Sequence, residues 1–214
     1  MKLSLSRIHY PVTTLGPGRR IGIWFQGCSI RCEGCISRDT WRFREGDVFP
    51  EDVMSRVDVW IDECDAITIS GGEPFDQAAG LFDLLKRLKA RNSKANVLVY
   101  SGYELEQLDA YPELRTGLID ALITDPYVRD ADQTKHLRGS DNQRLHFLTE
   151  LGKAVFSQCD RPLSDSDKSL DVMFDDEGTV WLAGIPRKGD MPRLAALLRE
   201  DGHVAHITEA PRLV

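Results

Sequence analysis

The strongest constraint on the fold is a regular alternation of predicted strands and helices between residues 20 and 125. Apolar, β-branched runs of strand length recur four times, at 20–27, 66–70, 95–101 and 119–125. The segments between them carry apolar residues at helical spacing, and helices are predicted at 50–64, 76–92 and 104–118, the last broken at Pro112. Such alternation predicts an α/β fold with a parallel sheet or a partial (β/α) barrel.

Polar and glycine-containing segments follow each of the four predicted strands. They are the loop that begins at Cys28, Gly71-Gly72-Glu73, Ser101-Gly102-Tyr103 and Asp125-Pro126. In parallel α/β folds, ligands bind beyond the carboxyl ends of the strands. We therefore expect these four segments to converge on one rim and to form an active site there.

The first of these segments, GCSIRCEGCISRDTW at residues 27–41, holds Cys28, Cys32 and Cys35, three of the five cysteines of the chain. Thiolates hold iron–sulfur clusters, and a complete 4Fe–4S cluster has four iron atoms to ligate. Three protein ligands leave one iron open to a small molecule. The alternative is a structural zinc site, but zinc prefers four ligands in paired spacings. Cys64 and Cys159 are expected to be inert buried side chains.

The cysteine spacing CxxxCxxC resembles that of the radical S-adenosylmethionine (radical SAM) superfamily. Further segments occur in the same order as in the activating proteins of anaerobic ribonucleoside-triphosphate reductase, which are glycyl-radical-enzyme activases. These segments are GPGRR, SGGEPF, YSGYELEQL, LIDALITDPYVRD and LRGSDNQRLHFL. The resemblance covers roughly residues 8–150 and implies a partial barrel of the radical SAM type.

The resemblance also implies a role for particular residues. Cys28, Cys32 and Cys35 would ligate a 4Fe–4S cluster whose fourth iron is chelated by S-adenosylmethionine, and no further catalytic residue is assigned. Glycines suit close approach of the backbone, and a carboxylate suits an ammonium group. The predicted cofactor-binding residues are Trp24, Ser70, Gly71, Gly72, Glu73, Ser101, Gly102, Tyr103, Asp125 and Asn142.

The chemistry implied is one-electron reductive cleavage of S-adenosylmethionine to methionine and a 5′-deoxyadenosyl radical, which abstracts hydrogen. An activase would leave a glycyl radical on a large partner enzyme and would need an electron donor of the flavodoxin or ferredoxin type. Two alternatives stay open. The same machinery would act on another peptide or small molecule, or the chain would be a non-catalytic iron–sulfur or other metal module.

Two features depart from the activating proteins. Pro126 stands where relatives often carry glycine after the aspartate, and it removes a backbone donor. The chain also continues beyond about residue 150, where those proteins usually stop. We therefore predict a radical SAM core domain at 1–150 and a small C-terminal α+β extension at 151–214. Within the extension, a polar linker is expected at 152–170, followed by two strands around an Asp-Glu-Gly turn, a helix at 191–202 and a last strand at 203–207.

Composition excludes several other classes of protein. The 214-residue chain has a formal net charge of -7, so nucleic acid is not an expected partner, although Arg19 and Arg20 form a local basic pair suited to an anion. No apolar segment approaches the roughly 20 residues of a membrane helix, and no signal peptide is apparent. An odd number of cysteines argues against a disulfide framework. A cytoplasmic protein is predicted.

Overall fold

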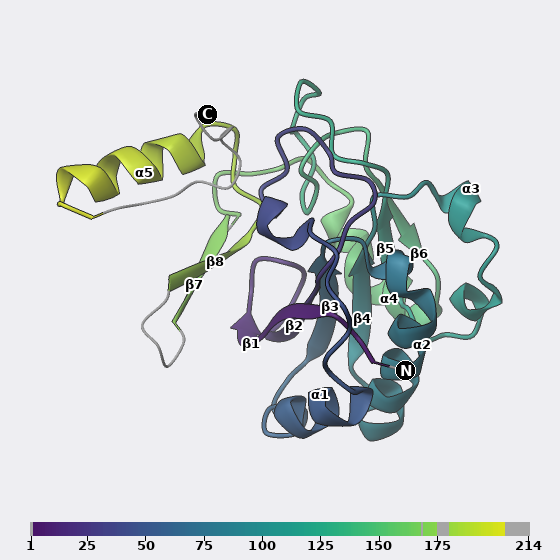
Figure 1. The fold of residues 1–214 in the computed structure, drawn as a ribbon. Helices are drawn as coiled ribbons and strands as arrows, with labels where there is room; N and C mark the ends of the chain where they lie inside the picture. The colour runs from purple at the N-terminus through teal and green to yellow at the C-terminus, as the bar shows by residue number, and fades with distance from the viewer. Residues whose placement is uncertain (1, 168, 175–179, 204–214) are drawn as a thin grey trace.

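A computed structural model describes residues 2–167, 169–174 and 180–203 of the chain. Its main feature is one six-stranded sheet, in which the strands lie side by side in sequence order (Figure 1). The strands from β2 to β5 are parallel, and the two outer strands are antiparallel to their neighbours. The six strands are β1 (Leu5–Val12), β2 (Arg20–Phe25), β3 (Ala66–Gly71), β4 (Asn96–Tyr100), β5 (Ala121–Thr124) and β6 (Arg144–Phe147).

Helices complete the core on both sides of the sheet. The α-helices are α1 (Pro50–Val57), α2 (Ala78–Arg91), α3 (Leu105–Leu108), α4 (Glu150–Phe156) and α5 (Asp190–Glu200). The 3-10 helices are η1 (Arg38–Thr40), η2 (Pro74–Gln77), η3 (Pro112–Arg115) and η4 (Ser157–Cys159). Among the helices of the described residues, none is long and apolar enough to cross a membrane.

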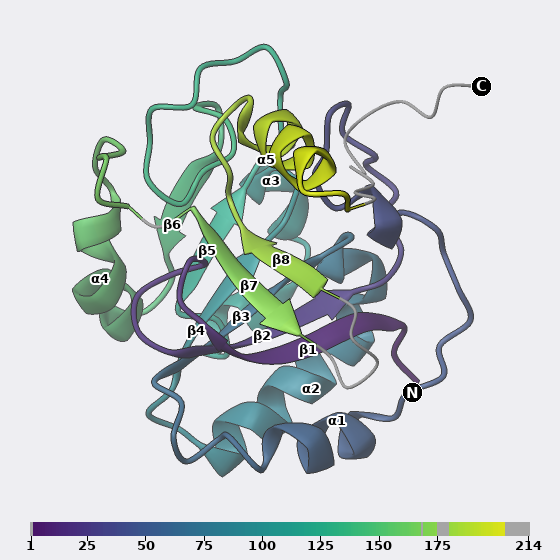
Figure 2. The same ribbon diagram turned by 90° about the vertical axis from the view of Figure 1, so that its left-hand side faces the viewer.

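The two faces of the sheet are covered by different parts of the chain. On one face α1 and α2 pack over Ile21, Ile23 and Ile67 in the largest apolar cluster. A separate two-stranded antiparallel sheet, β7 (Leu170–Phe174) and β8 (Val180–Gly184), lies over the opposite face (Figure 2). Because both faces are covered, all six residues of β2 are buried, as is typical of strands inside α/β folds.

The predicted α/β class and the four parallel strands are confirmed. The strand order runs from β1 to β6 without closure of the described strands into a complete barrel. The partial barrel of the radical SAM type therefore stays a prediction, and so does the division of the chain at residues 150 and 151. The predicted pair of strands and the helix of the extension are present as β7, β8 and α5.

Several local predictions were wrong. The antiparallel strands β1 and β6 were missed because charged residues and His interrupt both segments. The expected linker contains α4, whose Phe156 is fully buried against Leu98 and Ile123. The first helix ends at Val57 rather than residue 64. The expected Asp-Glu-Gly turn at 176–178, and residues 204–207 of the expected last strand, lie outside the described residues.

The basic pair of the sequence does not form an anion site, because the Arg20 side chain is fully buried. Its guanidinium donates to the Thr68 hydroxyl at 2.6 Å, the Ile67 carbonyl at 2.7 Å and the Asn96 side-chain oxygen at 2.9 Å. A fourth bond reaches the Pro17 carbonyl at 2.8 Å. Burial lowers the pKa of Arg20 to about 10. Arg20 therefore ties three strands together from inside the protein.

Candidate functional site

The four segments that follow the parallel strands converge on one cavity at the carboxyl edge of the sheet. All three cysteines of the CxxxCxxC loop line it, together with Ser70, Gly71, Gly72, Glu73, Ser101, Gly102 and Asp125. Most of the predicted site residues are thus brought together. Sequence reasoning did not assign five further residues that line the cavity, Ile30, Trp41, Tyr100, Tyr127 and Gln143.

The cysteine loop is held open by backbone contacts rather than by regular structure. Gly27 turns the chain away from β2 at a φ of +101°, a conformation that favours glycine. Its N–H donates to the Thr40 carbonyl at 2.7 Å, and the Cys28 N–H donates to the Trp41 carbonyl at 3.2 Å. Within the loop, the Cys35 N–H donates to the Cys32 carbonyl at 3.2 Å. Residues 38–41 therefore support the loop from behind.

The three thiols are free and partly shielded from solvent. Burial raises the pKa of each, and that of Cys35 reaches about 11. Cys28 and Cys32 lie close enough to Cys35 for their charges to raise its pKa further. Such thiols lose their protons when a metal centre binds them.

Two observations fit a 4Fe–4S cluster at this loop. The donor set is three thiols, which is the ligand type of such clusters. The buried indole N–H of Trp41 lies near enough to the Cys35 thiol to lower its pKa, and it has no other hydrogen-bond partner within the described part of the chain. Donors of this kind bond cluster sulfur atoms.

Gly71 and Gly72 allow β3 to pass directly against the cysteine loop. Gly71 has a φ of +109°. A Cβ at Gly72 would lie 2.0 Å from the carbonyl oxygen of Gly27, far inside van der Waals contact. The next residue, Glu73, donates its N–H to that same carbonyl at 2.8 Å. The two glycines, which we call the glycine cradle, thus let the backbone of β3 pass where any Cβ would collide with the backbone of Phe25 or Gly27.

The Glu73 carboxylate bonds to groups of the protein itself. It accepts from the Gly102 N–H at 2.7 Å, the Ser101 hydroxyl at 2.9 Å and the Phe75 N–H at 3.0 Å. The side chain is 1% exposed, and burial raises its pKa to about 7. Glu73 therefore joins the ends of β3 and β4 at the cavity, in addition to any contact with a ligand.

Tyr103 links the same rim to the cysteine loop. Its hydroxyl donates to the Asp76 carboxylate at 2.8 Å and lies 2.9 Å from the Ser29 hydroxyl. Asp76 also accepts from the Ser29 N–H at 2.7 Å. Tyr103 and Asp76 thus support the loop just after Cys28, and Tyr103 is not among the residues that line the cysteine cavity.

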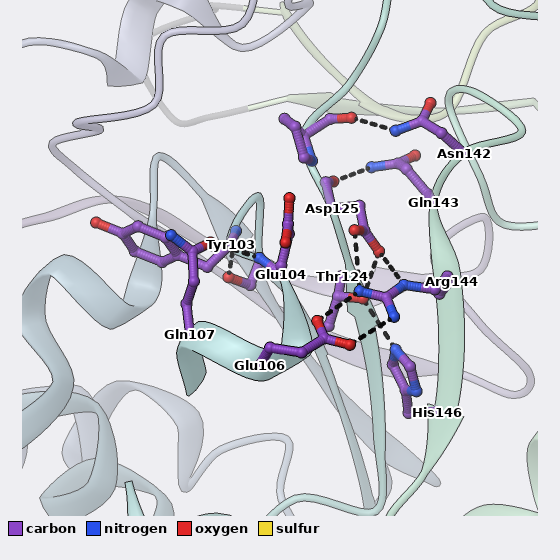
Figure 3. Close-up of polar contacts among 12 residues, drawn as sticks. Tyr103, Glu104, Glu106, Gln107, Thr124, Asp125, Asn142, Gln143, Arg144 and His146 are labelled. Atoms are coloured by element: carbon purple, nitrogen blue, oxygen red, sulfur yellow. Dashed lines mark hydrogen bonds and ion pairs between the residues drawn. The ribbon is translucent and has the colours of Figure 1, made fainter. Parts of the chain in front are cut away.

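Asp125 is held by a network of charged residues at the end of β5 (Figure 3). Its carboxylate accepts from the Arg144 guanidinium at 2.7 Å and 3.1 Å and from the Thr124 hydroxyl at 2.7 Å. The N–H groups on both terminal nitrogens of Arg144 also donate to the Glu106 carboxylate. Bonds from Arg144 and Thr124 outweigh desolvation and lower the pKa of Asp125. These bonds fix the carboxylate in place and keep it ionised. The Asp125 backbone has a φ of +78°, in the left-handed region.

Asn142 and Gln143 have different places at this rim. Asn142 donates to the Pro126 carbonyl at 2.8 Å and does not line the cavities described here. Gln143 lines the site, donates to the Asp125 carbonyl at 3.2 Å and accepts from the Gly139 N–H at 2.8 Å. The sequence signal for Gln143 was its place beside the predicted Asn142.

Trp24 lies deeper, on the face of the sheet opposite α1 and α2. It is 4% exposed and lines an adjoining cavity of about 500 Å³ that shares Cys35, Ser70 and Gly71 with the cysteine site. Tyr100 and Tyr127 line both cavities. The cysteine site thus opens onto a larger space with aromatic walls.

The segment that contains the three thiols and the two glycines falls within a match to a known family. A family model described as a 4Fe–4S single cluster domain matches residues 14–146, and the chain belongs to this family. Its residues beyond 146 lie outside the match.

The chain is similar in particular to curated proteins that share one name, "Anaerobic ribonucleoside-triphosphate reductase-activating protein". Those of Salmonella typhi and Escherichia coli strain K12 are each 30% identical over 148 residues, which is 65% of this chain and 96% of the relative. That of Enterobacteria phage T4 is 30% identical over 139 residues, 63% of this chain and 88% of the relative. The relatives match over nearly their whole length, whereas about a third of this chain lies outside each alignment.

Proposed function

We propose that the chain is a radical SAM activase that installs a glycyl radical on a large partner enzyme, such as an anaerobic ribonucleotide reductase. The observation that carries the proposal is the shared cavity of Cys28, Cys32 and Cys35 with the Gly71-Gly72 cradle, in a chain of the 4Fe–4S single cluster family. The names of the relatives support the partner. When bound, the cluster supplies an open iron and one electron to S-adenosylmethionine, whose cleavage gives methionine and the hydrogen-abstracting 5′-deoxyadenosyl radical.

The chain's own residues bind and orient these groups. Cys28, Cys32 and Cys35 would hold the cluster through their thiolates. Gly71 and Gly72 would let the backbone approach the methionine end of S-adenosylmethionine; a Cβ at Gly71 would collide with the Phe25 backbone, and one at Gly72 with the Gly27 carbonyl. Asp125, ionised and fixed by Arg144, would lie near the ribose or adenine of S-adenosylmethionine. This assignment keeps the electron donor outside the chain, and a flavodoxin or ferredoxin would fill that role.

A second candidate function uses the same cleavage with a different peptide or small molecule as hydrogen donor. The observation that favours it is that residues 182–189, beyond the family match, line the larger cavity. A third possibility, a non-catalytic iron–sulfur module, leaves the glycine cradle and the adjoining cavity without a role.

The test is anaerobic. The protein is reconstituted with iron and sulfide, reduced with dithionite and mixed with S-adenosylmethionine, and 5′-deoxyadenosine is measured. Cys32→Ala is expected to abolish the product. Cys64→Ala is the matched control, because Cys64 is a buried thiol just before the amino end of β3, away from the site, that donates to the Ile61 carbonyl.

Binding and partner measurements separate the three functions. A reconstituted protein that neither binds nor cleaves S-adenosylmethionine would refute both radical functions and leave the non-catalytic module. A protein that cleaves it is next incubated with an anaerobic ribonucleotide reductase, and a glycyl radical is sought by electron paramagnetic resonance. Cleavage without that radical favours the second candidate.

A further inference from the structure

The larger cavity beside the cysteine site has a wall that the activating proteins are not expected to share. Residues 182–189 of the C-terminal extension line it opposite Cys35, Ser70 and Gly71. These residues follow the segment matched by the family model, which ends at residue 146. The wall is therefore a feature of this chain outside the family match.

We propose that β7, β8 and the loop at 185–189 form a wall that encloses S-adenosylmethionine at its hydrogen-abstracting end. This inference rests on the proposed function, since it assigns the larger cavity to the same ligand. The extension lies across the face of the sheet that α1 and α2 leave open (Figure 2), and it is fastened near both edges of the sheet.

The first anchor is Asp171 on β7. Its carboxylate accepts from the Thr13 N–H at 2.6 Å and hydroxyl at 2.8 Å, and from the Thr14 N–H at 3.0 Å. The Thr14 hydroxyl lies 2.9 Å from the same carboxylate and 3.1 Å from the Ala183 carbonyl on β8. Asp171 thus fastens the hairpin to the turn that follows β1, and hydrogen bonds to a charged group are the stronger kind.

The second anchor is a guanidinium between two indoles. Arg7 on β1 lies 5.6 Å from the ring centroid of Trp24 and 4.7 Å from that of Trp181 on β8. Cation–π contacts of this kind are stabilising where the cation is partly desolvated. Arg7 also pairs with Asp39 at 3.0 Å, which joins the hairpin and the segment behind the cysteine loop to one side chain.

The third anchor is Gln133, between β5 and β6. Its side-chain amide donates to the Pro186 carbonyl at 3.0 Å and accepts from the Lys188 N–H at 3.2 Å. The Lys188 ammonium donates to the Ala131 carbonyl. The loop is therefore fixed on the side of the cavity away from β1, so the extension bridges the cavity.

The lining suits an adenosyl sulfonium and a reactive radical. Trp24, Tyr100 and Tyr127 present aromatic rings to the cavity; such rings attract cations and stack on planar bases. Closing a site expels water and suppresses side reactions of reactive intermediates. A wall at 182–189 would thereby keep the radical for its intended hydrogen donor.

The test measures hydrogen exchange and binding in the full-length, reconstituted protein. S-adenosylmethionine is expected to slow amide exchange at 180–189 in the wild type. Asp171→Ala and Gln133→Ala each remove one anchor, and the double variant removes both. If the wall is then in place one tenth of the time, the Kd for S-adenosylmethionine rises about tenfold. Val172→Ala is the matched control, since the neighbouring Val172 side chain is 56% exposed.

The outcomes are distinct. The wall is supported if S-adenosylmethionine slows amide exchange at 180–189 in the wild type, and if the double variant exchanges faster there and binds S-adenosylmethionine more weakly than the wild type. This support does not depend on whether each single variant behaves like the double variant or like the wild type. A wild type that binds S-adenosylmethionine without added protection at 180–189 refutes the wall and leaves the proposed function standing. The wall is also refuted if the double variant exchanges faster at 180–189 and keeps the wild-type Kd, or does not exchange faster at all. Failure of the wild type to bind refutes the proposed function itself.

Discussion

Gly72→Ala tests whether β3 and the cysteine loop need their close backbone approach. The added Cβ would lie 2.0 Å from the Gly27 carbonyl oxygen and 3.1 Å from the Thr40 carbonyl oxygen. Ordinary contact begins at 3.4 Å, so the Gly27 carbonyl must move by more than about 1 Å. That carbonyl accepts from Glu73 at 2.8 Å, and the Gly27 N–H donates to Thr40 at 2.7 Å. The substitution therefore strains the bond between the loop and the end of β3, and also the bond by which residues 38–41 support the loop.

The expected loss of unfolding free energy is about 3–5 kcal/mol. Overpacking contributes roughly 1–3 kcal/mol, and each weakened hydrogen bond about 1 kcal/mol. Urea denaturation of the cluster-free protein, kept anaerobic, should show a midpoint lower by roughly 1–2 M. Iron bound per chain after reconstitution should fall as well, because the displaced loop carries all three cluster cysteines.

Gly117→Ala is the control for the general cost of adding a methyl group to a glycine. A Cβ at Gly117 meets nothing within 4 Å, but its φ is +78°, so only a backbone cost of about 1–2 kcal/mol is expected. If Gly72→Ala unfolds at the same urea concentration as Gly117→Ala and binds a full complement of iron, the close approach does not hold the loop, and the argument for the cradle is wrong.

Three further predictions concern buried groups. The pKa of Glu73 is raised from 4.5 to about 7, so between these pH values the folded protein keeps a proton that the unfolded chain has released. The unfolding free energy should therefore fall by about 3 kcal/mol as the pH rises through this window. Denaturation of Glu73→Gln, measured from pH 5 to 8, should lack that fall. Arg20→Met leaves four acceptors, three of them in buried bonds, without their donor and should cost at least about 3 kcal/mol, measured by urea denaturation. A loss below about 1 kcal/mol would contradict the role of Arg20. Arg144→Gln removes the guanidinium that lowers the pKa of Asp125, so this pKa, followed by NMR titration, should rise, whereas Arg115→Gln, which removes an exposed pair, should leave it unchanged.

The parts of the fold that were predictable are those in which one local pattern decides the structure. Each parallel strand is a short apolar run, because both of its faces are covered. The outer strands β1 and β6 were missed, since partly exposed strands with Arg and His carry no such run. The helix α4 was missed because its segment is short and polar, and because Phe156 is its only fully buried aromatic residue. One such residue gives no helical spacing of apolar positions.

The site divides in the same way. The cysteine loop and the glycine cradle were predictable, because their spacing in the sequence reflects the chemistry directly. Trp41 and Tyr127 were not, since each reaches the cavity through the path of a loop. Burial of Arg20 was unforeseen as well: its four acceptors come from three separate segments of the chain.

The burial of β2 indicates that the C-terminal extension, which lies far from β2 in sequence, packs on the sheet. The odd-numbered residues of β2, including Ile21 and Ile23, face α1 and α2 in the largest apolar cluster. On the opposite face, Trp24 packs with Met173 and Ala183 of the hairpin. A continuous apolar strand requires cover on both faces, and here the second cover over Trp24 comes from the extension. The wall at the larger cavity and the burial of β2 thus result from the same packing. If the extension did not pack on the sheet, the burial of all six residues of β2 would be unexplained.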